Sequence, residues 1–114
     1  MDYTEIAERL PENVCGDVWF SLGEDGSFSF NACSPAGEDL WIEGNCRSPE
    51  TAIEDIRREV RFHRETFDVG EHVMMHAPNA GRDGTPDFET LVDDAKEIRS
   101  MLAELDEEVG AWSL

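Results

Sequence analysis

Histidine is one of the few side chains in this sequence whose spacing could support chemistry. His72 and His76 lie four residues apart, a spacing at which a helix presents two metal ligands on one face. The segment does not have the HExxH pattern and offers no evident third ligand, and Gly70 and Pro78 would shorten any helix here. We therefore expect surface or packing histidines and no bound metal.

The cysteines do not form a pattern typical of a catalytic or disulfide-bonded protein. Cys15, Cys33 and Cys46 are odd in number, have no CxxC spacing and match no known Cys/His/Asp arrangement. Small buried apolar residues in a reduced chain fit them better. The sequence thus predicts a protein that is not an enzyme and uses no cofactor. A metal-dependent or thiol enzyme is an alternative, and it would require a bound metal or a cysteine of low pKa.

Charge is the most unusual property of the chain. Its 114 residues include 27 acidic and 9 basic side chains, for a net charge of -18. A field of this sign repels phosphate, which excludes ordinary binding to nucleic acid or anionic lipid and favours basic partners. Adaptation to a salt-rich host is an alternative cause of the acidity. No apolar run is long enough for a membrane helix, and the acidic N-terminus is unlike a signal peptide, so we expect a cytoplasmic protein.

Alternation of apolar and polar residues predicts a three-stranded antiparallel meander. The strands are expected at residues 18–22, 28–33 and 40–43, with turns rich in glycine and acidic residues between them. Register follows from placing like faces opposite each other. The expected pairs are Leu22 with Phe28, Phe20 with Phe30, Val18 with Ala32, Phe30 with Ile42, and Ala32 with Leu40.

One helix before the meander in the sequence and one after it complete an α+β body with α-β-β-β-α order at residues 1–67. Apolar residues at helical spacing predict a short helix at 2–10. Ser48 is expected to cap a second helix, which begins at Pro49 and runs to about Phe67. The arginines of this second helix are expected on its exposed surface.

A long acidic C-terminal helix is predicted within residues 85–114, after a connection at 68–84. Thr85 and Pro86 supply the cap chemistry at its start, and residues 73–75 of the connection are expected to form a short strand or an apolar latch. Apolar residues recur along the helix with heptad spacing. They are Phe88, Leu91, Ala95, Ile98, Leu102, Leu105 and Val109. This stripe should be buried, either on the same domain or in a homodimer.

Carboxylates displayed by this helix are the strongest functional signal in the sequence. Helical spacing places several acids on the face away from the apolar stripe, and acidic loops between the strands would add to them. The expected partner-binding acids are Asp93, Asp94, Glu97, Glu104 and Glu107 on the helix, and Glu24, Asp25, Glu38 and Asp39 in the loops. A merely solvated helix face is the alternative.

Two tryptophans on the polar face of the meander are a second signal. Trp19, Asn31 and Trp41 are expected to form one row across the three strands. Large aromatic residues on a polar face are typical of an interface anchor. The alternative is that the long C-terminal helix lies across this face and buries it.

A small, very acidic chain without catalytic motifs resembles the DNA-mimic inhibitors of mobile elements, the anti-restriction and anti-CRISPR proteins. This is a resemblance of type, in size and charge, and it carries over no residue. It implies a partner that grips nucleic acid in a basic groove, such as a CRISPR effector or a restriction enzyme. The inhibitor would occupy that groove.

A second resemblance covers about residues 18–62. The strand at 18–22, Glu24-Asp25-Gly26, the strands at 27–32 and 40–44, and the helix start at 48–52 resemble HicB-type antitoxins. These neutralise a small basic toxin that binds RNA. The sequence departs from this family in its long acidic helix and its lack of a recognisable DNA-binding tail. The α-β-β-β-α order also matches the topology of the double-stranded-RNA-binding domain, and an acidic dimeric scaffold is a further alternative.

Overall fold

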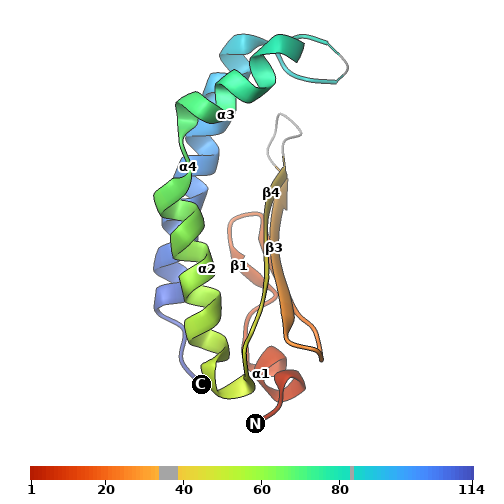
Figure 1. Cartoon of the computed structure of the whole chain (residues 1–114), viewed down its shortest axis with the longest axis vertical. Coiled ribbons are helices and arrows are strands. Elements are labelled where there is room, and N and C mark those ends of the chain that lie inside the picture. The colour runs from red at the N-terminus through yellow and green to blue at the C-terminus, as the bar shows by residue number, and fades with distance from the viewer. Residues whose placement is uncertain (34–38, 83) are drawn as a thin grey trace.

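The chain folds as an antiparallel sheet with helices packed along one of its faces. The computed structural model describes residues 1–33, 39–82 and 84–114. Its sheet has four strands in the order β1-β2-β3-β4, and α2 and α4 run along the same side of it (Figure 1). The elements are α1 (Tyr3–Arg9), β1 (Asn13–Cys15), β2 (Val18–Leu22), β3 (Ser27–Cys33), β4 (Asp39–Asn45), η1 (Pro49–Thr51), α2 (Ala52–Thr66), α3 (Val69–His76), η2 (Ala77–Asn79) and α4 (Phe88–Gly110).

The α+β class is confirmed, but the meander has one strand more than the sequence predicted. The added strand β1 pairs with β2 through Asn13 and Trp19, and Gly16 makes the turn between them with a φ of 50°. A side chain is strained in that left-handed conformation, and glycine is not. Three residues are too few to show an alternating pattern, so this strand left no periodic signal.

The register predicted for the three long strands is confirmed. Four of the five expected pairs lie opposite each other: Leu22 and Phe28, Phe20 and Phe30, Phe30 and Ile42, Ala32 and Leu40. Their side chains fill the face of the sheet that meets the helices, where Phe30 and Ile42 are fully buried. The predicted alternation therefore fixes which face of the sheet becomes the core.

The beginning and end of the helix after β4 agree with the predicted cap chemistry. Ser48 Oγ accepts a hydrogen bond from the Thr51 backbone N–H at 3.3 Å, and η1 leads directly into α2. α2 ends at Thr66, with Phe67 as its C-cap. Asp55, a buried residue of α2, ties the helix start to the end of β4. It accepts bonds from the Arg47 backbone N–H and Nε at 2.9 Å each and from the Thr51 hydroxyl at 2.8 Å.

The expected connection contains a helix, α3, in place of a short strand or latch. Asp68 caps it by accepting a hydrogen bond from the Glu71 backbone N–H at 2.8 Å. Only Val73 of the apolar run 73–75 is buried, because a helix turns successive side chains to different sides. α3 packs against α4 and extends the helical layer beyond the sheet (Figure 1).

The C-terminal helix starts later than predicted and buries its stripe within one chain. Asp87 is its cap, accepting from the Thr90 backbone N–H at 2.9 Å, so the expectation of Thr85 and Pro86 in this role is wrong. Phe88, the first helical residue, is 54% exposed, which corrects its place in the buried stripe. The other members of the stripe are buried: Leu91, Ala95, Ile98, Leu102, Leu105 and Val109. A dimer is not needed to cover them.

Candidate protein-binding surfaces

Four of the five acids predicted on the C-terminal helix form one exposed line. We call Asp93, Glu97, Glu104 and Glu107 the acidic ridge; all four are exposed. At 1.5 Å per residue, the ridge is about 21 Å long, and helical periodicity keeps its members within one face. Among the described residues, none of the four is in an ion pair. Their carboxylates therefore face solvent.

The fifth acid, Asp94, does not belong to this surface. It is only 3% exposed, so the expectation that it contacts a partner is wrong. Asp94 follows Leu91 by three residues and precedes Ile98 by four, and residues at these spacings share one side of a helix. Its position beside the apolar stripe thus buries it despite its charge.

Another acid of α4, Asp106, is neutralised by arginines of α2. Asp106 is 7% exposed, and its Oδ2 lies 2.8 Å from Arg64 Nη1, with its Oδ1 3.6 Å from Arg61 Nε. Arg57 Nε donates to the Val109 carbonyl at 3.0 Å, and the same guanidinium donates to the Trp112 carbonyl. We call Arg57, Arg61 and Arg64 the arginine clamp.

Arg61 and Arg64 lie on the exposed surface of α2, as expected, and the clamp pairs them with Asp106. Arg57 is only half-buried. The three arginines recur at spacings of four and three residues, which places them along one line of the helix. That spacing can be read from the sequence and indicates that the three arginines share one side of α2. The sequence does not indicate which helix they contact. The clamp binds Asp106 and the carbonyls of Val109 and Trp112, so it does not pair with the acidic ridge.

The ridge continues onto the turn between β1 and β2. A hollow of about 200 Å³ is lined by Cys15, Asp17, Glu97 and Glu104, among others, and Asp17 is exposed. Burial, followed by the nearby charges of Glu104 and Glu108, raises the pKa of Cys15 to about 11. This thiol stays protonated at neutral pH, as an activated nucleophile would not.

The second described thiol, Cys46, is buried, and burial followed by the charge of Asp55 raises its pKa to about 11. Elsewhere, the rings of His72 and His76 lie 4.8 Å apart on α3. No group of three or more His, Cys, Asp or Glu side chains suited to a metal ion occurs within residues 1–33, 39–82 and 84–114. In the same part of the chain, no helix has the length and apolarity needed to cross a membrane.

The acidic turn between β2 and β3 does not join the ridge. Glu24 and Asp25 are exposed at the turn between β2 and β3, which lies on the far side of the sheet from α4 (Figure 1). Asp25 Oδ1 accepts bonds from the Ser27 hydroxyl at 2.6 Å and the Ser27 backbone N–H at 3.0 Å, and these bonds lower its pKa. Glu38 lies outside the described residues. Asp39 begins β4, and its side chain is not described.

The tryptophan row is present and is open to solvent. Asn31 lies opposite Trp19 on one side and opposite Trp41 on the other, and the two tryptophans are 53% and 54% exposed. We call Trp19, Asn31 and Trp41 the tryptophan row. The C-terminal helix packs on the opposite face of the sheet, so the alternative in which it buries the row is wrong (Figure 1).

The chain was compared with protein-family models, with curated proteins and with solved structures. It matches no family model, no curated protein and no solved structure.

Proposed function

We propose that this protein is a non-enzymatic cytoplasmic inhibitor that occupies the basic nucleic-acid-binding groove of a bacterial defence complex. The target would be a CRISPR effector or a restriction enzyme, and the inhibitor would present a DNA-like acidic surface to it. The observation that carries this proposal is the acidic ridge, whose four carboxylates face solvent on one side of a well-packed helix.

The spacing of the ridge suits a groove that binds phosphates. Four charges over about 21 Å give one charge per 5 to 7 Å. One strand of duplex DNA carries a phosphate about every 3.4 Å, so the mean spacing of the ridge is about twice that of the phosphates. Each exposed ion pair contributes only about 0–1 kcal/mol. The ridge must therefore act collectively, by attracting a basic groove and competing with phosphate.

Rigidity of the ridge supports the same proposal. The stripe on the other side of α4 is buried in the core, and the arginine clamp attaches the C-terminal part of the helix to α2. The carboxylates are thus held in place before a partner arrives, which lowers the entropy lost on binding. A flexible acidic tail would lose more conformational entropy on binding, and its net binding free energy would be smaller.

A HicB-like antitoxin is the second candidate. The observation that favours it is the order β2, acidic turn, β3, β4 and capped α2, which follows the element order of that family. Its partner would be a small basic toxin that binds RNA. An acidic scaffold that dimerises through the stripe of α4 is not proposed further, because that stripe is buried within one chain.

Competition with DNA tests the proposed function. A purified CRISPR effector or restriction enzyme bound to labelled target duplex is titrated with this protein, and fluorescence anisotropy reports release of the duplex. The proposal expects release without binding of the duplex by the inhibitor itself, and weaker inhibition as salt rises. Micromolar binding of duplex DNA by the inhibitor would refute mimicry. Inhibition of a small RNA-cleaving toxin, with no effect on any DNA-bound complex, would favour the antitoxin.

A further inference from the structure

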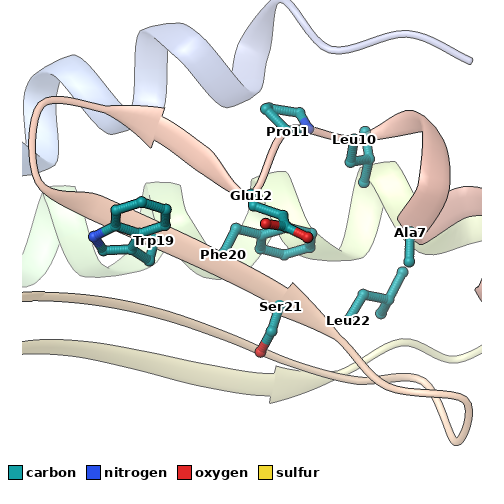
Figure 2. A pocket seen from close by; sticks show the side chains of 8 residues that line it. All are labelled: Ala7, Leu10, Pro11, Glu12, Trp19, Phe20, Ser21 and Leu22. Atoms are coloured by element: carbon teal, nitrogen blue, oxygen red, sulfur yellow. The ribbon is translucent and has the colours of Figure 1, made fainter.

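The outer face of the sheet has two hollows that combine the same chemical groups. The first lies between α1 and β2, where Glu12 and Trp19 border it together with Leu10 (Figure 2). The second lies over β3 and β4 and is bordered by Trp41 and Glu43. Each hollow therefore contains one exposed tryptophan and one exposed carboxylate.

The two hollows are neighbours on one continuous surface. Ser21 and Leu22 line both of them. Ser21 lies opposite Ser29, with their hydroxyl oxygens 3.0 Å apart, and Ser29 lies opposite Glu43. The tryptophans stand on strands two apart in the sheet, so their backbones are separated by about 10 Å. A short segment of a partner could reach both hollows at once.

The size of the hollows indicates single side chains as their occupants. Their volumes are about 300 and 340 Å³, at the small end of the range of about 300–1,000 Å³ typical of small-molecule clefts. Both are shallow features of a sheet surface, and each is bordered by a large aromatic ring. They therefore fit individual side chains of a docked chain better than an enclosed ligand.

The chemistry of each hollow selects a cation. An indole face attracts a guanidinium through its π electrons, and a neighbouring carboxylate accepts charge-assisted hydrogen bonds from it. No described residue that lines either hollow is basic, and the net charge of -18 adds to the attraction. Arginine suits such a pair better than lysine, because its planar group stacks on a ring and donates several bonds at once.

We propose that the tryptophan row and its two carboxylates, Glu12 and Glu43, form a receptor for a segment of a partner protein with two arginines. In a polyproline II segment, side chains three residues apart point the same way and are about 9 Å apart, which matches the separation of the tryptophans. An Arg-x-x-Arg segment would thus place one guanidinium in each hollow. The proposal rests on the proposed function only in that the partner is the same basic protein, since it uses a surface other than the acidic ridge.

A short peptide tests this receptor without the full partner. The probe is acetyl-Pro-Arg-Pro-Pro-Arg-Pro-amide, and its control replaces both arginines by neutral citrulline. Calorimetric titration should detect the arginine peptide and not the citrulline peptide. Trp41→Leu and Glu43→Gln should each weaken binding about fivefold, as loss of one cation–π or charge-assisted contact implies. Both side chains are exposed, so the fold should persist, which circular dichroism checks.

A matched variant separates a specific site from general attraction. Glu107→Gln removes the same charge from the acidic ridge and should change peptide binding less than twofold. Equal effects of Glu43→Gln and Glu107→Gln, equal binding of the citrulline peptide, or no binding of the arginine peptide at millimolar concentration would each overturn the proposal. The peptide titration contains no nucleic-acid-binding partner, so its failure would not contradict the proposed role of the acidic ridge. Failure of DNA competition equally leaves the peptide result standing.

Discussion

Replacing Asp106 by asparagine tests whether the arginine clamp holds α4 against α2. The Asp106 side chain is 8% exposed, and its carboxylate oxygens lie 2.8 Å from Arg64 and 3.6 Å from Arg61. Those two cations are 42% and 63% exposed, so they stay well hydrated when the acid is removed. The variant leaves the geometry of α4 intact and deletes only the charge of the acceptor.

The expected loss lies between that of a buried and that of an exposed ion pair. Breaking a buried pair costs about 3–5 kcal/mol, and breaking an exposed one about 0–1 kcal/mol. A buried acceptor with half-exposed donors should lose about 2 kcal/mol, in the range for hydrogen bonds to charged groups. For a domain of this size, an unfolding entropy near 2.1 cal/mol/K per residue converts this loss into a fall in Tm of about 8 °C.

Thermal and urea unfolding, followed by circular dichroism, measure this loss. Removing any negative charge from so acidic a chain also relieves repulsion, so a control with the same charge change is essential. Glu107→Gln is that control, because Glu107 is the next residue and is exposed. Its Tm should stay within about 2 °C of the wild type, as expected for exposed sites. Equal melting of Asp106→Asn and Glu107→Gln would refute the clamp as a source of stability.

Three further predictions concern groups that are buried or partly buried. Burial raises the pKa of Asp55, but its hydrogen bonds outweigh this and hold the pKa below the usual value. Its stabilisation is therefore present above about pH 4 and lost as pH falls through the folded-state pKa. Urea unfolding from pH 2 to 6 should show this loss in the wild type and a smaller one in Asp55→Asn. Arg57→Ala should release Trp112, whose ring lies 5.1 Å from that of Phe20, and shift its fluorescence to longer wavelength when it is the only tryptophan left. An unshifted spectrum would contradict this. Because their pKa values are raised to about 11, Cys15 and Cys46 should react with iodoacetamide about a hundredfold more slowly than in the unfolded chain, as measured by mass spectrometry at pH 7.5. Equal reaction rates in the folded and unfolded chain would contradict the raised pKa values of the two thiols.

Strand alternation made much of the sheet predictable. Val18, Phe20, Phe28 and Phe30 follow a period of two, and that period determines both the core face and the register. The same pattern placed the tryptophan row on the outer face. The sequence could not decide whether a helix would cover that row, because this depends on which face the connection after β4 leads to.

The missed features depend on contacts between elements distant in the sequence. Asp94 is among the acids predicted on the partner-binding face, although its spacing to Leu91 and Ile98 puts it beside the buried stripe. Asp106 was not recognised as a buried residue, since the arginines that neutralise it are on another helix. The sequence did not predict α3, because Gly70 disfavours a helix and the apolar run 73–75 shows no helical period. The helix has only eight residues and begins after the cap Asp68.

Charge reversal on α4 tests whether the acidic ridge occupies a basic groove. The variant carries Glu97→Lys, Glu104→Lys and Glu107→Lys, and inhibition of duplex binding by the target complex is measured at fixed salt.

The matched control carries the same three changes at exposed acids away from the ridge, Glu8, Glu50 and Glu65. Both variants have the same net charge, and circular dichroism confirms that both are folded. We expect the ridge variant to inhibit at least tenfold more weakly than the wild type, from about 0.5–1 kcal/mol per lost pair, while the control stays within about threefold. Equal inhibition by the two variants would contradict this expectation.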